Sequence, residues 1–358
     1  MDLTALSITA RKAIVLLALG IIAFIVIRIV VGVVVNFVKS LNPPSPPAAT
    51  KIFGTLAPIK FDQPVTPSSK FTYTLETIDS QLPTLPSILE VYTTRQSPSL
   101  FQSVNQGKIR AKGFGFSAEP AQVSANIYQW QDPTQVGYTF TMDVVSGDFR
   151  LILDPTQRGE LLTNRLNFDS TEAINRARTY LKNTQSFSPS FENGDSQLQF
   201  LNITPKGITK VNSAGQANSY RVDFFPSKIN DKYPIMSQNP QSDLLNVTLL
   251  ASSQFSREHV FELNYQQFEI DLDGSGTYDI KSAQLAWEEL KNGSGIVVKN
   301  SKLGGSIAIN SIYLGYFKES KTKYLKPVYV FEGTSSVDLI NNDFTAILPA
   351  IAVENKAE

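Results

Sequence analysis

The chain of 358 residues has no cysteine and only one histidine, His259, and these absences exclude several kinds of site. Without cysteine there is no thiolate nucleophile and no cysteine-ligated zinc, and a single histidine cannot form a histidine metal cluster. A Ser-His-Asp triad would have to use His259, and no G-x-S-x-G nucleophile elbow accompanies it. We interpret His259 as a surface residue and expect a protein that is not an enzyme and has no cofactor.

An excess of charge of either sign is also missing, since 32 Lys and Arg residues balance 32 Asp and Glu residues. A net charge of zero provides no general attraction for nucleic acid or anionic glycans, so we expect no nucleic-acid partner. Carboxylates are nevertheless numerous. A glycan hydrolase needs only two of them at the right separation, and this remains the alternative class of enzyme.

The sequence does contain one long apolar run, AIVLLALGIIAFIVIRIVVGVVVNFV, from Ala13 to Val38. At about 1.5 Å per residue, a helix of this length exceeds a hydrocarbon core of about 30 Å. A cleaved signal would have a shorter apolar region and a small-residue cleavage site. The run therefore predicts one uncleaved transmembrane helix over residues 13–38, with the membrane as a partner.

Arg11 and Lys12 precede this run, and the positive-inside rule places such residues in the cytoplasm. We therefore expect a cytoplasmic tail over residues 1–12 and an extracytoplasmic C-terminal domain at the cell membrane. Arg28 lies inside the run, where a charge costs on the order of 2.5–3.5 kcal/mol. It either extends to the outer headgroups or meets a polar group of another membrane helix, which would be a membrane or envelope protein partner.

Prolines are frequent over residues 39–67, beginning with NPPSPPAAT at Asn42. Such a segment favours a polyproline-like conformation of about 3.1 Å per residue and joins neither helices nor sheets. It predicts a linker.

Beyond the linker, alternating apolar and polar residues predict strands, and three segments predict helices, the first over residues 99–112. Ser170 or Asp169 can cap a helix over residues 170–183, and Ser282 can cap another over residues 282–292. We expect the helices to bury Ala173, Ala177, Leu181, Ala286 and Leu290. The predicted strands are 70–77, 88–94, 124–130, 137–145, 149–154, 198–204, 219–225, 244–250, 260–271, 307–318, 328–332 and 344–350.

A helix followed by antiparallel strands recurs about three times along the chain. This order predicts an α+β fold of two or three helix-on-antiparallel-sheet units after the membrane helix. The expected units are residues 68–156, 157–259 and 260–358.

Two stretches of the third unit resemble a known family. Residues 278–293 (YDIKSAQLAWEELKNG) look like the helix start of PepSY-like units, and residues 312–317 (IYLGYF) and 325–331 (LKPVYVF) are similar to the closing strands of YycH/YycI-type proteins. Those bacterial proteins have one N-terminal membrane helix and an outer domain of such repeats, and they regulate a cell-wall-sensing histidine kinase. The resemblance is best over residues 260–331 and implies a regulatory protein. The proline spacer and an added C-terminal strand depart from the family.

One motif, DLDGSGTYD, has the ligand spacing of an EF-hand calcium loop, with oxygen-bearing side chains at alternate positions and glycine at the sixth. Its twelfth position is Ser282, where calcium binding requires glutamate. We interpret the motif as a glycine-rich turn between a strand and a helix, with weak calcium binding as the alternative. The candidate ligands are Asp271, Asp273, Ser275, Thr277 and Asp279.

Aromatic residues are plentiful, with 13 Tyr and 22 Phe, and most alternate with polar residues as a core-facing row does. Four tyrosines of the third unit gather over a short stretch and could instead form an exposed surface for a ligand or partner. These are Tyr313, Tyr316, Tyr324 and Tyr329.

These features predict a non-catalytic, membrane-anchored binding or regulatory protein of the cell envelope. The first alternative is an envelope glycan hydrolase that uses paired carboxylates. The second alternative is a structural or assembly component of a surface complex.

Overall fold

The computed structural model of the chain divides into two compact units, residues 1–48 and residues 49–358. The described residues are 16–17, 19–34, 48–60, 66–94, 100–131, 133–134, 136–166, 169–237, 244–252, 259–267, 269–299, 305–319, 322–335 and 343–352.

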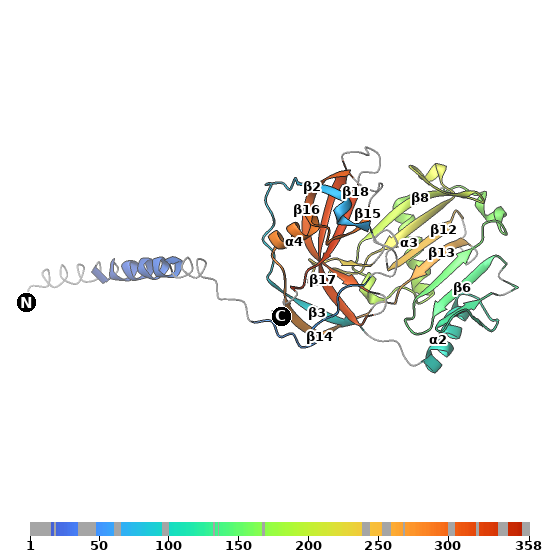
Figure 1. Ribbon diagram of the computed structural model, residues 1–358, viewed down its shortest axis with the longest axis horizontal. Coiled ribbons are helices and arrows are strands. Elements are labelled where there is room, and N and C mark those ends of the chain that lie inside the picture. The colour runs from blue at the N-terminus through green and yellow to red at the C-terminus, as the bar shows by residue number, and fades with distance from the viewer. Residues whose placement is uncertain are drawn as a thin grey trace, which may run out of the picture. The chain divides into compact units, whose positions relative to one another are not determined.

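The described part of the first unit is helical over residues 16–17 and 19–34, drawn in blue in Figure 1. Its large apolar side chains are exposed, and Arg28 is exposed among them. Residues 19–34 make about 24 Å of helix at 1.5 Å per residue. None of the helices in the described residues is long and apolar enough to cross a bilayer, so the predicted transmembrane helix is corrected. The ends of the predicted run, 13–15 and 35–38, lie outside the described residues.

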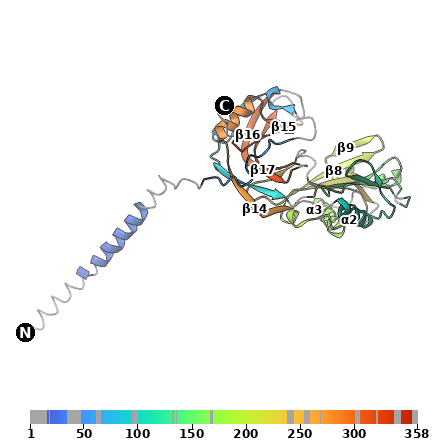
Figure 2. The same ribbon diagram turned by 60° about the horizontal axis from the view of Figure 1, so that its bottom comes forward.

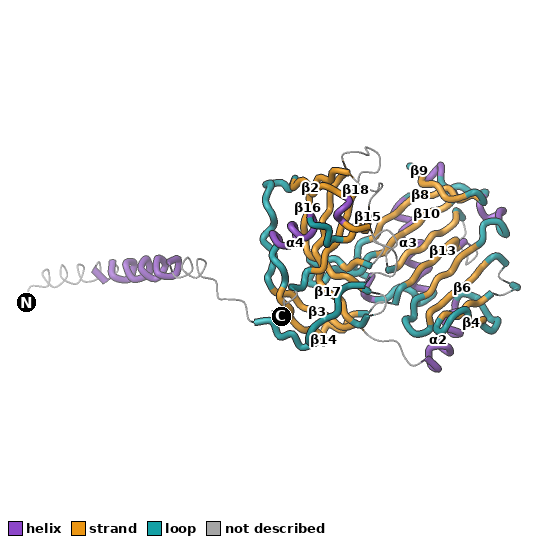
Figure 3. Tube along the Cα trace, viewed as in Figure 1, coloured by secondary structure: helices purple, strands orange, loops and turns teal. Residues whose placement is uncertain are grey.

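The second unit consists mainly of strands in two nine-stranded sheets, as the orange tube in Figure 3 shows. Sheet B has the order β4-β5-β6-β7-β13-β12-β10-β8-β9, and every pairing in it is antiparallel. Its strands are β4 (Ala121–Gln122), β5 (Ile127–Trp130), β6 (Tyr138–Asp143), β7 (Phe149–Leu153), β8 (Ser196–Thr204), β9 (Gly207–Val211), β10 (Ser219–Phe224), β12 (Leu245–Leu250) and β13 (Val260–Tyr265).

Sheet A is built around the long pair of β16 and β17. One edge of β16 pairs with β17, and its other edge pairs in parallel with β2 and with β11, so this sheet is mixed. Its strands are β1 (Thr66–Pro67), β2 (Phe71–Leu75), β3 (Ile88–Thr94), β11 (Ile235–Met236), β14 (Ile270–Asp279), β15 (Ile296–Lys299), β16 (Gly305–Lys318), β17 (Tyr324–Ser335) and β18 (Asp343–Pro349).

The connectivity of the two sheets is nested. Sheet A takes β1–β3 and β14–β18 from the two ends of the second unit, whereas sheet B takes its strands from the chain between them, which also supplies the short β11 to sheet A. Each segment predicted as a separate unit, 68–156, 157–259 or 260–358, contributes strands to both sheets. The predicted α+β fold of consecutive helix-on-sheet units is therefore wrong, because long-range pairing joins strands that the order of elements had assigned to different units.

The local helix predictions are confirmed. The helix α3 (Ser170–Asn183) is capped by Asp169, whose carboxylate accepts a hydrogen bond of 2.8 Å from the Glu172 N–H. It buries Ala173, Ala177 and Leu181 as expected. Figure 2 shows α3 and the helix α2 (Leu100–Gly113) together on one face of sheet B.

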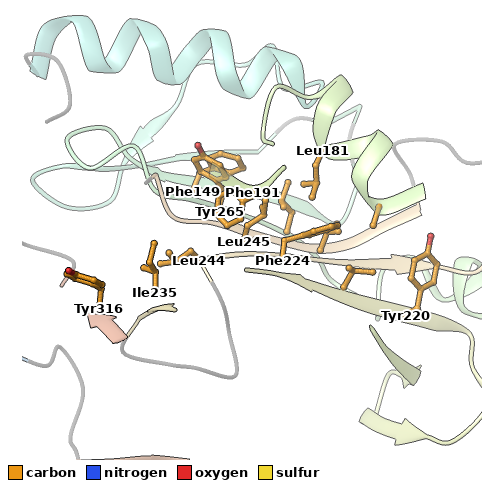
Figure 4. Packing of buried hydrophobic residues seen from close by; sticks show 14 of the residues in the cluster. Phe149, Leu181, Phe191, Tyr220, Phe224, Ile235, Leu244, Leu245, Tyr265 and Tyr316 are labelled. Atoms are coloured by element: carbon orange, nitrogen blue, oxygen red, sulfur yellow. The ribbon is translucent and has the colours of Figure 1, made fainter. Parts of the chain in front are cut away.

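A large aromatic and aliphatic core fills the space between these helices and sheet B. Figure 4 shows Phe149, Tyr265, Leu245 and Phe224 on the helix side of the strands. The rings of Phe149 and Tyr265 stack with centroids 4.8 Å apart. The guanidinium of Arg110 lies over both rings and donates a hydrogen bond of 2.6 Å to the Gln185 carbonyl beyond α3, so it ties α2 to the end of α3.

The helix α4 (Ala283–Lys291) follows β14 of sheet A and begins after Ser282. The Ser282 hydroxyl accepts a hydrogen bond from the Leu285 N–H, so Ser282 caps this helix as predicted. Both residues expected to be buried in this helix, Ala286 and Leu290, are fully inaccessible. The buried Ser68 hydroxyl donates to the Leu290 carbonyl at 2.7 Å, which fixes the end of α4 next to the segment before β2.

We expect Ala177→Leu in α3 to lower stability by about 1–3 kcal/mol, because Ala177 is fully buried and the helix packs against β8 and β10 without room for three more carbons. Thr179→Leu, two residues further on the exposed side of the same helix, is the matched control and is expected to change stability by less than about 0.5 kcal/mol. Urea denaturation measures both. Equal effects of the two substitutions would contradict the packing of α3.

Candidate functional site

The face of sheet B opposite the helices carries polar side chains that adjoin across neighbouring strands. Because side chains alternate along a strand, Arg150 lies on the face opposite to Phe149. The strand register places Asp223 opposite Asn246, Asn246 opposite Asn264, and Asn264 opposite Arg150. We call this set the polar strip. Its members are Thr141, Arg150, Gln197, Gln199, Arg221, Asp223, Asn246, Thr248, Glu262 and Asn264.

One half of the polar strip is centred on Glu262. Its Oε1 accepts a hydrogen bond of 3.0 Å from the Arg150 Nε and another of 3.0 Å from the Asn264 amide. The Asn264 amide also donates to the Asn246 Oδ1 at 3.0 Å. Three neighbouring strands, β7, β13 and β12, are thus linked through side chains as well as through their backbones.

The other half of the polar strip is centred on Asp223. Its Oδ1 accepts a hydrogen bond of 2.6 Å from the Arg221 Nε, and its Oδ2 accepts one of 3.3 Å from the Gln199 amide. Burial raises the pKa of the Asp223 carboxyl above its ordinary value, and the charge of Arg221 opposes that rise.

Burial changes along the polar strip. Asn246 and Asp223 are inaccessible to solvent, while 54% of the Arg150 side chain is exposed. Burying an ion pair such as Arg221 with Asp223 has a desolvation penalty that can exceed the attraction between the charges. These polar groups are therefore not explained by stability alone, and the exposed end around Arg150 and Thr141 is open to a partner.

The polar strip is better suited to binding a partner than to catalysis. The polar strip presents amides, two arginines and two carboxylates, so its donors and acceptors fit a polar, uncharged or zwitterionic surface. Glu262 and Asp223 lie two strands apart and two residues out of register, about 12 Å between their backbones, whereas retaining and inverting glycosidases have their carboxyl groups about 5–5.5 Å and about 6.5–9.5 Å apart. Each carboxylate is also bound to an arginine.

The described residues of the second unit also line surface cavities. One of about 430 Å³ lies along α3 and is lined by the two carboxylates of Asp169 and Glu172. Asp169 caps the helix and Glu172 binds Arg176, so both are already engaged. Another, of about 610 Å³, lies beside β6 and includes Asp154, and a third, of about 350 Å³, lies between residues 82–87 and the start of α4.

The predicted calcium ligands lie along a strand and not in a loop. β14 pairs with β3 on both sides of a bulge between Asp271 and Ser275, which replaces the predicted turn. Thr277 exchanges hydrogen bonds with Thr50, and Asp279 forms an ion pair of 3.0 Å with Lys51. Asp273 is exposed. Among the residues that the structure describes, no group of three or more metal-ligating side chains comes together.

The four predicted interaction tyrosines do not form one exposed surface. Tyr316 and Tyr329 are fully buried, and their hydroxyls donate to the backbone carbonyls of Glu90 and Lys281. Burial raises the pKa of Tyr329 to about 12. The two others are half-buried: Tyr313 donates to Glu332 at 2.8 Å, and the ring of Tyr324 packs against Phe53.

The polar strip was missed in the sequence, although its signal is visible. In FRLIL, LNVTLL, SYRVDF and VFELNY, polar residues occupy alternate positions, which is also typical of an ordinary solvated face. Only the register shows that these residues adjoin.

We expect Arg221→Met to destabilise the chain by about 3 kcal/mol at pH 7, because it leaves the Asp223 carboxylate buried without its cation. A carboxyl whose folded pKa lies above its unfolded value binds a proton preferentially in the folded state. The stability lost in Arg221→Met should therefore decrease as the pH falls below the raised pKa of the Asp223 carboxyl, toward the ordinary pKa of 3.8.

Arg150→Met is the matched control, because the Arg150 side chain is half-exposed and its pair is expected to contribute less than about 1 kcal/mol. Urea denaturation at pH 7 and pH 5 measures both variants. Equal, pH-independent losses would show that the buried half of the polar strip does not behave as an ion pair.

We expect millimolar calcium to leave the melting temperature unchanged, because Thr277 and Asp279 are engaged by Thr50 and Lys51. A site filled at 100 times its dissociation constant would add about 2.7 kcal/mol. Differential scanning calorimetry with calcium, and with magnesium as the control ion, measures the shift. A rise with calcium alone would restore the calcium interpretation of residues 271–279.

Comparison with known proteins assigns no family to this arrangement. No protein-family model matches the chain, and no curated protein is similar to it.

Proposed function

We propose that this chain is a non-catalytic binding protein that recognises a protein partner through the polar strip of sheet B. The observation that carries the proposal is the row of polar side chains across β7, β13, β12, β10 and β8. Hydrogen bonds join Arg150, Glu262, Asn264 and Asn246 in one half and Arg221, Asp223 and Gln199 in the other, and the strand register places Asn246 opposite Asp223. A partner at the exposed end would meet side chains that the buried network already holds in place, so little conformational entropy would be lost on binding.

A regulatory role is favoured over a purely structural one by the resemblance of residues 260–331 to YycH/YycI-type regulators, which stays a prediction. The location in the cell envelope also stays a prediction. The glycan hydrolase is not favoured, because the carboxylates of the polar strip are separated and bound to arginines.

Site-specific photo-crosslinking in the cells that make the protein tests this proposal. A photoreactive phenylalanine analogue replaces Thr141, which lies on the polar strip next to Arg150. The control position is Thr179, which is exposed on α3 at the other face of sheet B. We expect a crosslinked protein from position 141 and none of the same mass from position 179.

Adding Arg150→Ala to the Thr141 variant is expected to reduce the yield of that product at least threefold, because it removes the exposed charge that the partner meets. Identical products from positions 141 and 179, or a product that is insensitive to Arg150→Ala, would refute the proposal. The molar ratio of partner to chain in the product separates regulation from assembly, since a structural component would appear in larger, repeated complexes.

A further inference from the structure

A segment just before sheet A is held against it by a dedicated set of side chains. We call residues 50–60, TKIFGTLAPIK, the strap. The Lys51 N–H donates to the Thr277 carbonyl at 3.0 Å, and the Thr277 N–H donates to the Thr50 hydroxyl at 3.0 Å. Since β3 pairs with the other edge of β14, the strap lies along the remaining edge. This segment was predicted as part of a linker.

The strap has separate contacts for three consecutive side chains. The ammonium of Lys51 lies 3.0 Å from the Asp279 carboxylate, and the ring of Phe53 lies 5.1 Å from that of Tyr324. Ile52 lies over Gly276, where a Cβ atom would come within 2.4 Å of its side chain. Glycine at 276 thus makes a notch for an aliphatic side chain.

Other groups of sheet A bind the backbone of the strap and are indifferent to its side chains. The Tyr278 hydroxyl accepts from the Phe53 N–H and donates to the Gly54 carbonyl. Further along, the Lys326 ammonium donates to the Ala57 carbonyl at 2.8 Å, and the Glu319 carboxylate accepts from the Lys60 N–H at 3.1 Å.

Lys326 and Glu319 are themselves an ion pair of 2.6 Å, with only 4% and 3% of their side chains exposed. Burying an ion pair carries a desolvation penalty, but the buried pair presents a fixed donor and a fixed acceptor to a peptide backbone. The Ile59 side chain packs beside this pair against Phe317, Val328 and Val330.

The strap is partly exposed and adopts an uncommon backbone conformation. Ile52 remains 59% exposed, and Lys51 and Gly54 have φ angles of 46° and 66°, a region that residues other than glycine rarely adopt. The Gly54 N–H donates to the Lys51 carbonyl at 2.8 Å and closes a turn. The Tyr278 hydroxyl holds this turn through its bonds to Phe53 and Gly54.

We propose that this surface is a peptide-binding groove which the strap occupies in cis, and that its other occupant is a segment of a partner protein with the same chemistry. Such a segment has a basic, an aliphatic and an aromatic residue followed by glycine in a turn, and a second aliphatic residue five positions after the glycine. The acidic Asp279, the notch at Gly276 and the ring of Tyr324 select the first three. This inference is independent of the polar strip, which lies on the other sheet.

The strap competes with any free peptide for the groove. A tethered segment acts at an effective concentration on the order of millimolar, so a free peptide at micromolar concentration cannot displace an intact strap. A strap without the side chains of Lys51, Ile52 and Phe53 keeps its backbone hydrogen bonds and Ile59 but loses three contacts, so it should leave the groove more often while the groove residues are unchanged.

The test uses the full chain and a fluorescein-labelled peptide, TKIFGTLAPIK, followed by fluorescence anisotropy. The strap variant combines Lys51→Ala, Ile52→Ala and Phe53→Ala, all on the surface segment. We expect this variant to bind the peptide at least tenfold more tightly than the natural chain does. A peptide of the same composition in scrambled order is expected not to bind either protein.

Adding Gly276→Val to the strap variant fills the notch and is expected to reduce peptide affinity at least tenfold. Gly159→Val is the matched control, because nothing lies within 4 Å of the position of its Cβ atom. Circular dichroism and the melting temperature establish that each variant is folded. If the triple variant fails to fold, Phe53→Ala alone replaces it, with a smaller gain expected.

Two results would overturn the proposal. One is a folded strap variant that binds the peptide no better than the natural chain, or binds it equally well with Gly276→Val. The other is a natural chain that is dimeric by light scattering and becomes monomeric in the strap variant, which would assign the groove to the strap of a second copy.

Discussion

The pairing of β3 with β14 is the constraint on which the second unit depends. Seven residue pairs join Ile88–Thr94 to Ile270–Asp279, across the whole of the chain that forms sheet B. Apart from the short visit at β11, the chain therefore leaves sheet A at β3 and returns to it on the neighbouring strand β14. Because the exit and the return are adjacent, sheet B can be inserted without breaking the order of sheet A, and β17 then completes the contact by pairing with β3 at Tyr324 and Leu325.

Within that frame, the two sheets use polar side chains differently. Sheet A buries Lys326 and Glu319 next to the strap, where each binds a backbone group as well as its charged partner. Sheet B arranges its polar residues as a row across neighbouring strands, where hydrogen bonds join Asn264 to Asn246 and Gln199 to Asp223. The first arrangement is suited to holding one chain segment, and the second to presenting a broad surface.

Local features of the fold could be predicted from the sequence, and long-range ones could not. The caps at Asp169 and Ser282 and the buried stripe of α3 depend on residues within one turn of each other. The sheet to which a strand belongs depends on partners far along the chain. The tyrosines illustrate the difference: β17 is buried on both faces around Tyr329, so alternation gave no indication of which face would be exposed. The polar strip needed the register of six strands, and the strap needed β14 as its neighbour.

The nested connectivity also determines when the parts of the molecule can form during synthesis. All strands of sheet B are consecutive except for the short excursion to β11, so they can pair before β14–β18 exist. β2 and β3 are made first, yet their partners β14, β16 and β17 are made last. Pairings of such high sequence separation form slowly, because a long loop must close first. The strands that are synthesised first therefore keep unpaired edges until the C-terminal strands have been made. A chaperone that protects strand edges would act on residues 66–94.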